Sequence, residues 1–340
     1  MGIRHLATAA LISALIWALI LALSAALVLA PAAQAADGAT YPTRPIRLVV
    51  PGAPGTPADV RARDIAEKLS ADLGKPVVID NRVGAAGQLA LEAVMRSAPD
   101  GHTLGILGSQ LVILPHMRKE PFDPVKDLVP IARIAYAPIL LIVNGAVPAA
   151  SARELVAYAQ RHPGKLNAAS PGAATTPHLA LELFRRVADV DVHHVPYRDG
   201  GRLVTDLLAG EVQMAFDFLH MTRGHLQSGR LRALAVSGPQ RLPGYPEIPT
   251  FEEAGIAGMN GIGGWLGIVA PVGTPPSVVA RWEAGVNMAL QDPAIRARLI
   301  ETGADPRPGT AQDFAEFLAS EHRRWGRVIA DAGIRLERGE

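Results

Sequence analysis

Apolar and polar residues alternate along this chain in blocks that predict strands and helices in turn. The apolar run 46–50 predicts a buried strand, and apolar residues spaced i, i+3, i+4 and i+7 predict a helix over 59–69. Gly74 and Pro76 mark the end of that helix, and 77–79 has the composition of a second strand. A strand, a helix and a strand in this order predict a parallel sheet with a crossover helix.

The same alternation continues to the end of the sequence. Further strands are expected at 102–107, 139–143, 166–170, 192–196, 213–216, 231–236 and 265–269. Further helices are expected at 89–96, 151–160, 178–185, 203–208, 277–290, 293–301 and 311–332. This order predicts an α/β fold, in which ligands bind beyond the carboxyl ends of the strands.

A short string occurs twice, each time between an expected strand and an expected helix. PGAPGTP fills 51–57 and PGAATTP fills 171–177. A turn that leads from a strand into a helix presents unpaired backbone N–H groups and the positive end of the helix dipole, which together favour an anion. Two such turns predict an anionic ligand held from two sides. Two ordinary turns in a chain rich in Ala, Gly and Pro are the alternative interpretation.

The N-terminal segment has the pattern of an export signal. Arg4 precedes an uncharged apolar stretch at 6–30, and Ala33 and Ala35 satisfy the rule of small residues at a signal cleavage site. We therefore expect a signal peptide over 1–35, cleaved after Ala35, and a periplasmic protein. The apolar stretch is also long enough to span a bilayer, so an uncleaved anchor is the alternative.

Composition narrows the classes of function. The chain has 340 residues, enough for two lobes, and its 33 Lys and Arg residues nearly balance its 32 Asp and Glu residues. This balance gives no basic field for nucleic acid. There is no cysteine, which excludes disulfides, cysteine-ligated metals and a thiol nucleophile. A large exported protein without disulfides fits a bacterial periplasm.

A series of short strings resembles one family along the whole chain after the signal. From 41 to 334 they include, in order, YPTRPIRLVVPGAPGTPAD, GKPVVIDNRVGAAG, APDGHTL, PFDPVKDLVPIA, HPGKLNAASPG, TTPHLALELF, HHVPYR, DLLAGEVQMAFD, GRLRALAVS, IPTFEEAG and WLGIVAPVGTPPSVV. In these strings the chain resembles the Bug-type periplasmic solute receptors, which are the substrate-binding proteins of the tripartite tricarboxylate transporter family.

The resemblance implies the type II periplasmic-binding-protein fold, with two α/β lobes joined by crossing hinge strands. Lobe 1 would comprise 41–141 and 262–340, and lobe 2 would comprise 142–261. It also implies a monomer that is not an enzyme, needs no cofactor and closes over a small carboxylate: a di- or tricarboxylate, an acidic amino acid or an aromatic acid. The implied partner is an integral-membrane permease. A sensor that docks on a membrane kinase, or a periplasmic enzyme, is the alternative.

The candidate ligand contacts are groups of the two turns and of other expected strand ends. They are, in chain order, Ala53, Gly55, Thr56, Asp59, Ser109, Gln110, Ser170, Gly172, Thr175, Thr176, His178, Tyr197 and Asp217. Asp59, an anion, would cap N–H groups or orient a water rather than touch a carboxylate. Thr176 stands before Pro177 and also fits an ordinary N-cap, so Thr175 is the better candidate for a direct contact. Asp217 would accept from a ligand ammonium if the ligand is an amino acid.

The sequence departs from the family pattern at positions that bear on ligand identity. The family has an aromatic residue after the first Pro of the first turn, followed by a Gly-Gly pair, whereas this chain has Gly52 and then Gly55-Thr56. Ala174 replaces a glycine of the second turn, and Phe218 replaces an asparagine. The carboxylate class is therefore expected to hold, while no specific ligand can be transferred.

Metal binding and enzyme chemistry are not expected. His193 and His194 are adjacent on an expected strand, so their rings point to opposite faces and cannot easily share an ion. For His178 a packed, neutral ring is as well supported as a ligand contact. No nucleophile elbow of the Gly-x-Ser-x-Gly type occurs, and 84–87 is too short for a dinucleotide fingerprint.

Overall fold

The computed structural model describes residues 41–84, 87–117, 122–172, 175–197 and 200–334. All the helices and strands below lie in one unit that begins at Arg44. The expected signal peptide with its cleavage after Ala35, and Ala174 of the second turn, lie outside the described residues. Within the described ranges, no helix has the length and the apolar character that crossing a bilayer requires.

The first sheet combines strands from the early and late parts of the chain. Its order is β11 (Asp305–Pro306), β4 (Leu128–Pro138), β10 (Gly263–Pro271), β3 (Thr103–Gly108), β1 (Ile46–Val50) and β2 (Val77–Asn81). β1 is parallel to both of its neighbours, β2 and β3, while β10 runs antiparallel to β3 and β4. The first turn therefore leaves the carboxyl end of an inner strand.

The second sheet, from the middle of the chain, repeats this topology. Its order is β7 (Val192–Pro196), β6 (Leu166–Ser170), β8 (Met214–Asp217), β5 (Leu140–Asn144) and β9 (Leu231–Val236). β6 is parallel to β7 and β8, and β5 runs antiparallel to β8 and β9. β6 thus holds the place that β1 has in the first sheet, so the two turns leave equivalent strands.

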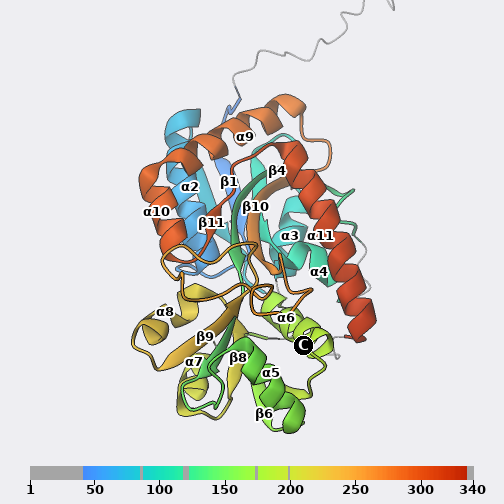
Figure 1. The fold of residues 1–340 in the computed structure, drawn as a ribbon. Coiled ribbons are helices and arrows are strands. Elements are labelled where there is room, and N and C mark those ends of the chain that lie inside the picture. Colours follow the sequence, from blue (N-terminus) through green and yellow to red (C-terminus); the bar gives the residue numbers. More distant parts are fainter. Residues whose placement is uncertain (1–40, 85–86, 118–121, 173–174, 198–199, 335–340) are drawn as a thin grey trace, which may run out of the picture. The chain divides into compact units, whose positions relative to one another are not determined.

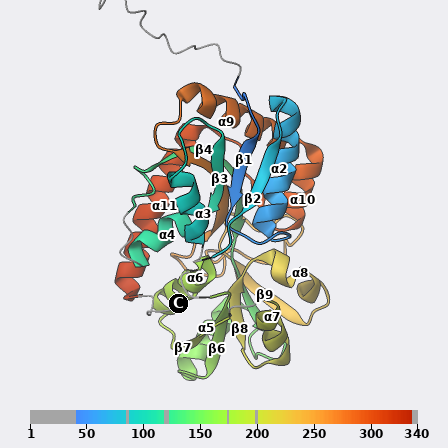
Figure 2. The ribbon, with the colours of Figure 1, turned by 180° about the vertical axis from the view of Figure 1, so that it is seen from behind.

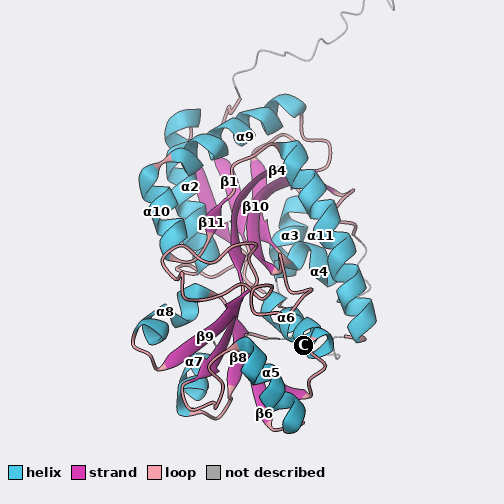
Figure 3. Cartoon of the chain, in the orientation of Figure 1, coloured by secondary structure: helices cyan, strands magenta, loops and turns pink. Residues whose placement is uncertain are grey.

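Helices cover both faces of each sheet, and each sheet with its helices is called a lobe below. In lobe 1, α2 (Pro57–Leu73) and α10 (Pro293–Glu301) lie on one side, α3 (Gln88–Met95), α4 (Gln110–Met117) and α11 (Ala311–Ala332) on the other, and α9 (Pro276–Gln291) across one end (Figure 1, Figure 2). In lobe 2, α5 (Ala152–Arg161) and α6 (Thr176–Val187) face α7 (Gly200–Ala209) and α8 (Leu219–Gln227) across the sheet. Figure 3 shows the strands at the centre of both lobes, which confirms the α/β class.

Most expected elements are present, and the differences have local causes. β1, β9, α10 and α11 coincide with the ranges expected from the sequence. The sequence interpretation missed β4, α4 and α8. Pro130 lies inside β4, Pro115 lies inside α4, and Gly224 lies inside α8. Each of these residues disfavours the element that contains it, so packing rather than local preference forms these elements.

The chain passes between the two lobes at two places, which lie side by side at Ser237. β4 leads through Ile139 into β5, and the segment after β9 returns through Ile262 into β10. The Ser237 hydroxyl accepts from the Ile139 N–H at 2.8 Å and donates to the Ile262 carbonyl. The Ser237 N–H donates to the Ile139 carbonyl at 2.9 Å. One buried side chain therefore ties both crossings together. The lobe boundaries given above, 141/142 and 261/262, lie near these crossings and stay a prediction.

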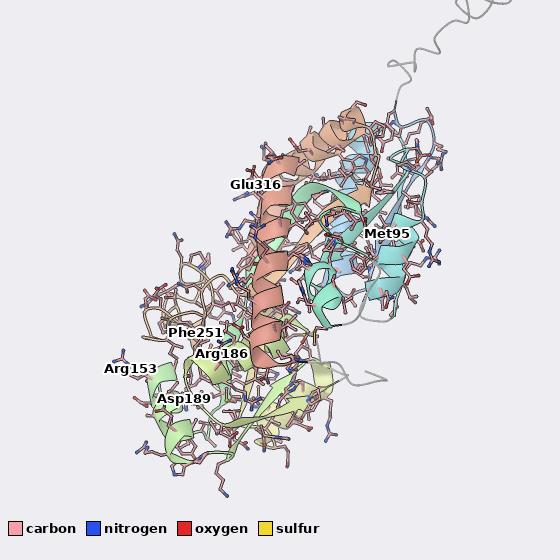
Figure 4. All side chains as sticks on the ribbon, turned by 90° about the vertical axis from the view of Figure 1, so that its right-hand side faces the viewer. Met95, Arg153, Arg186, Asp189, Phe251 and Glu316 are labelled. Atoms are coloured by element: carbon pink, nitrogen blue, oxygen red, sulfur yellow. The ribbon has the colours of Figure 1, made fainter. Side chains whose placement is uncertain are left out.

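Aromatic packing and an ion pair hold the segments around these crossings. Phe251, in the segment that returns to lobe 1, is fully buried and stacks on Phe216 of β8, with ring centroids 6.2 Å apart. Phe184 of α6 contacts both rings, with centroids 5.4 Å and 6.4 Å away. Figure 4 shows one end of α11 beside Arg186 of α6, whose guanidinium pairs with Asp331 at 2.7 Å. The returning segment is thus part of the core of lobe 2.

We expect Ser237→Ala to destabilise the protein by about 2 kcal/mol or more, because it leaves the Ile139 N–H and the Ile262 carbonyl buried without that partner. Urea denaturation of the mature chain measures the change. Ser228→Ala is the control, since that exposed hydroxyl bonds only within its own helix end, and it should change stability by less than about 0.5 kcal/mol. Equal small effects at both serines would contradict the role given to Ser237.

Candidate functional site

A cavity of about 500 Å³ lies between the lobes, beyond the carboxyl ends of β1, β3, β6 and β8. Lobe 1 lines it with the start of α2, the end of β3 and parts of β4 and β10. Lobe 2 lines it with the second turn, the start of α6, the end of β8 and the start of α8. The candidate residues that line it are Thr56, Ser109, Gln110, Thr175, Thr176 and Asp217.

The first turn is closed by hydrogen bonds of its own donors. The Thr56 hydroxyl donates to the Ala53 carbonyl at 2.8 Å, and the Thr56 N–H donates to the same carbonyl at 3.2 Å. Gly55 adopts φ of +84°, a conformation that glycine allows at little cost, and its N–H donates to Asp59 Oδ2 at 2.9 Å. These donors hold the turn, and a ligand would have to share or replace those bonds.

Asp59 is the anchor of this turn, and it does not line the cavity. Its carboxylate accepts from both ends of the Arg63 guanidinium, at 2.9 Å and 3.0 Å, and from the Asn81 amide at 2.9 Å. The hydrogen bond from Arg63 is the main reason that the pKa of Asp59 falls to about 2, with Gly55 and Asn81 adding to it. The same Asn81 amide donates to the Gly52 carbonyl at 2.7 Å. The negative charge beside the turn is therefore balanced by Arg63.

The second turn repeats the pattern of the first. The Thr175 hydroxyl donates to the Gly172 carbonyl at 2.7 Å, as Thr56 does to Ala53 in lobe 1. Thr175 also caps α6 by accepting from the His178 N–H at 3.4 Å. The expectation that Thr176 is the N-cap is therefore wrong: Thr176 is the first residue of the helix, since Pro177 fits the second helical position as well as the first.

His178 and Ser170 belong to a buried cluster next to the cavity rather than to its lining. The rings of His178 and His194 stack with centroids 4.2 Å apart and planes 12° apart, and Ser170 Oγ lies 2.7 Å from His194 Nε2. Burial lowers the pKa of each histidine to about 4, so both rings are neutral at neutral pH. These rings pack and hydrogen-bond inside lobe 2.

This cluster contains the potential metal ligands that come together within the described residues: His178, Glu182 and His194. The nitrogen lone pairs of two stacked, nearly parallel imidazoles lie in separate, nearly parallel planes, so they cannot converge on one ion without rotation of a ring. Both Glu182 oxygens also accept from Arg185, each at 3.0 Å. The arrangement is that of a packed ion pair and a ring stack, and we propose no metal there.

The end of β3 joins the cavity to the returning strand β10. Ser109 is buried and accepts from the Trp265 N–H at 3.1 Å, while its hydroxyl lies 3.5 Å from the Gly263 carbonyl. Gln110 begins α4. On the other side, Phe218 lies against Gly264, where an added Cβ would meet its ring at 2.7 Å. The absence of a side chain at Gly264 thus lets an aromatic ring of lobe 2 rest on lobe 1.

Asp217, at the end of β8, is a buried acid that lines the cavity. Its Oδ1 accepts from the Phe218 N–H at 2.7 Å, and within the described residues its Oδ2 has no hydrogen-bond partner. Burial raises the pKa of Asp217 to about 7, because the charged form loses its hydration. Near neutral pH this carboxyl can therefore donate a hydrogen bond to a ligand or accept one.

Several candidate residues lie near the cavity without lining it. They are Ala53, Gly55, Asp59, Ser170, Gly172, His178 and Tyr197. Tyr197, for example, donates its hydroxyl to Asp206 at 3.0 Å within lobe 2. Ligand contact by any of the candidates stays a prediction.

Sequence reasoning missed other residues of the lining, among them Arg61, Ala135, His220 and Met221. Arg61 lies one helical turn beyond Pro57, so the periodicity of α2 could have placed it on the face that the first turn presents. The other three lie on β4 and α8, the elements that the sequence interpretation did not include.

Comparison with known proteins identifies one family over most of the chain. A family model described as a tripartite tricarboxylate transporter family receptor matches residues 61–334. The chain belongs to this family. Its members are periplasmic solute-binding receptors rather than enzymes. The resemblance found in the sequence is thereby confirmed.

The alignments with three of these relatives cover most of this chain and nearly all of each relative. Protein BugT of Bordetella pertussis is 34% identical over 301 residues, which are 88% of this chain and 92% of BugT. The structure of R. palustris Rpa4515 with adipate is 34% identical with a TM-score of 0.77, over 87% of this chain and 99% of that one. The structure of MatC (Rpa3494) from Rhodopseudomonas palustris with bound malate is 33% identical with a TM-score of 0.73, over 85% and 100%. The two-lobed receptor fold is therefore confirmed.

We expect Asp217→Asn to change how the stability of the receptor depends on pH. The carboxyl has a raised pKa of about 7, so between about pH 4 and 7 the folded state holds a proton that the unfolded state has lost, and the native residue loses stability as pH rises. Asparagine cannot ionise, so the stability of the variant relative to that of the native protein should rise by up to about 3 kcal/mol from pH 4.5 to pH 8. Urea denaturation at both pH values measures this gain, and a difference that does not change with pH would contradict the buried, titrating acid.

Proposed function

We propose that this receptor captures a small carboxylate between its two lobes in the periplasm and delivers it to the membrane permease of a tripartite tricarboxylate transporter. The observation that carries the proposal is the pair of equivalent turns at the starts of α2 and α6, which meet at one cavity. Each helix start has a positive dipole end, and the two point to the same space from different lobes.

The charges around the turns favour an anion there. Asp59, the acid nearest the first turn, is neutralised by Arg63 and does not line the cavity. Thr56 and Thr175 place a hydroxyl-bearing residue of each lobe in the lining. A carboxylate that accepts from both lobes would bind the closed form better than the open form, and only such a difference can drive closure.

The relatives support a carboxylate as the ligand. Structures of two family members of about one-third identity were solved with adipate and with malate. The family also links this chain to a transporter, and we propose that the receptor meets the permease as a monomer after export by a cleaved signal peptide over 1–35.

A binding panel on the mature chain tests the proposal. The protein is unfolded and refolded to remove carried-over ligand, and its thermal unfolding is followed with di- and tricarboxylates, acidic amino acids and aromatic acids. A ligand at 100 times its dissociation constant should add about 2.7 kcal/mol of stability, which is several degrees for a chain of this size. If no carboxylate stabilises the folded, stripped protein, and titration calorimetry shows no binding, the proposed function is wrong.

We expect Thr175→Ala to weaken carboxylate binding about tenfold, which is about 1.4 kcal/mol, because Thr175 lines the cavity and its hydroxyl holds the second turn. Thr175→Ser keeps the hydroxyl and should bind nearly as the native protein does. Titration calorimetry with the best ligand of the panel measures both.

The same pair of substitutions at Thr56 tests the other lobe. A clamp with contacts from both turns predicts losses of similar size for Thr56→Ala and Thr175→Ala. A loss at one threonine alone would contradict a ligand held by both lobes.

A further inference from the structure

Arg61 is a cation without a counter-ion in the cavity. It is the only Arg or Lys among the described residues that line this space, and its side chain is half-buried. Its Nη2 donates to the Thr302 hydroxyl at 3.3 Å, and it forms no ion pair within the described residues. Thr302 is a neutral acceptor, so the charge of Arg61 is left uncompensated.

The acids next to Arg61 in the sequence, and the acid next to its hydrogen-bond partner Thr302, bind other arginines. Asp64, three residues after Arg61, is held by Arg298 at 2.8 Å. Asp59, two residues before Arg61, is held by Arg63 at 2.9 Å. Glu301, next to Thr302, is held by Arg223 at 2.7 Å. Within the described residues these acids therefore already have cationic partners of their own.

The other ionisable groups of the cavity do not neutralise Arg61 either. Burial, and secondly the charge of Arg61, lower the pKa of His220 to about 4, so this ring is neutral at neutral pH. Asp217 lines the same cavity but forms no ion pair with Arg61, both residues being described. Burial acts on Arg61 itself in the direction of a lower pKa, yet a guanidinium keeps its proton at neutral pH.

A half-buried cation is stabilised by an anion that shares its low-dielectric surroundings. We propose that Arg61 binds a second acidic group of the ligand, so that this receptor selects diacids over monoacids of the same length. The inference rests on the proposed function, since it takes the first acidic group to lie at the two turns.

The position of Arg61 allows it to bind one acidic group of the ligand while the two turns bind the other. Arg61 is five residues beyond Thr56, which is about 7.5 Å along the axis of α2 at 1.5 Å per residue. A guanidinium also offers two parallel N–H groups, the geometry that matches a carboxylate. The two acidic groups would therefore lie at opposite ends of the ligand, with the apolar part between them facing the neighbouring Phe218 and Met221.

Matched pairs of ligands test this inference by titration calorimetry on the refolded, stripped receptor. Adipate is compared with hexanoate, and terephthalate with 4-methylbenzoate, because in each pair a methyl group takes the place of the second carboxylate. The native protein should bind at least one diacid about 10- to 100-fold more tightly than its monoacid. Arg61→Met should remove that preference while leaving the monoacid affinity within about threefold, and Arg61→Lys should keep part of it.

Arg96→Met is the control for the loss of one positive charge, because Arg96 is exposed at the C-terminal cap of α3 and pairs with Glu92 outside the cavity. It should keep the full preference. Equal binding of diacid and monoacid by the native protein, or a preference that survives Arg61→Met, overturns the inference and leaves the carboxylate receptor intact. If the native protein binds none of the four acids and no member of the wider panel, the proposed function is wrong and this inference falls with it.

Discussion

The Ser237 hydroxyl holds the two crossings between the lobes at one point, and the geometry of the cavity depends on that point. Each crossing continues into an inner strand, β5 in one sheet and β10 in the other, so neither can shift without disturbing a core. A relative motion of the lobes must therefore bend the chain near Ile139, Ser237 and Ile262 and leave both sheets intact. This is the arrangement expected of a hinge: few residues, buried hydrogen bonds, and rigid elements on either side.

The repeated sheet topology explains why one ligand can be approached by two similar turns. β1 and β6 occupy equivalent places, so the segments that leave them reach α2 and α6 from the same side of their sheets. In each turn a threonine hydroxyl donates to a carbonyl three residues earlier, at 2.8 Å for Thr56 and 2.7 Å for Thr175. The strings PGAPGTP and PGAATTP nevertheless align Thr56 with Thr176, one residue away from the structural match. The repeated string therefore identified the right two segments, but it assigned the N-cap of α6 to Thr176 instead of Thr175.

The sequence could predict the fold well and the cavity only in part. Periodicity located the elements whose local preferences agree with their packing, such as β1 and α11, and it failed for β4 and α8, where Pro130 and Gly224 oppose the structure they lie in. Those two elements contribute Ala135, Ala137, His220 and Met221 to the lining, and these residues were missed with them. Contacts between residues far apart in the sequence could not be predicted either. The stacking of His178 on His194, for example, depends on the register between a helix and a strand, which no local pattern contains.

In the proposed site, backbone N–H groups bind the acidic group and side chains contact the rest of the ligand. This difference explains how members of one receptor family can share a ligand class and still bind different ligands. Pro57 and Pro177 each remove one N–H donor at the starts of α2 and α6. The remaining N–H groups there are donors whatever the side chains are, so most substitutions would leave the proposed anion site in place. Side chains that line the rest of the cavity have no such constraint. Phe218 rests on Gly264, and Arg61 brings a charge that the described protein does not balance. Because an uncompensated charge in a partly buried cavity discriminates more strongly than apolar contact does, we expect Arg61 to have more influence on ligand choice than Phe218.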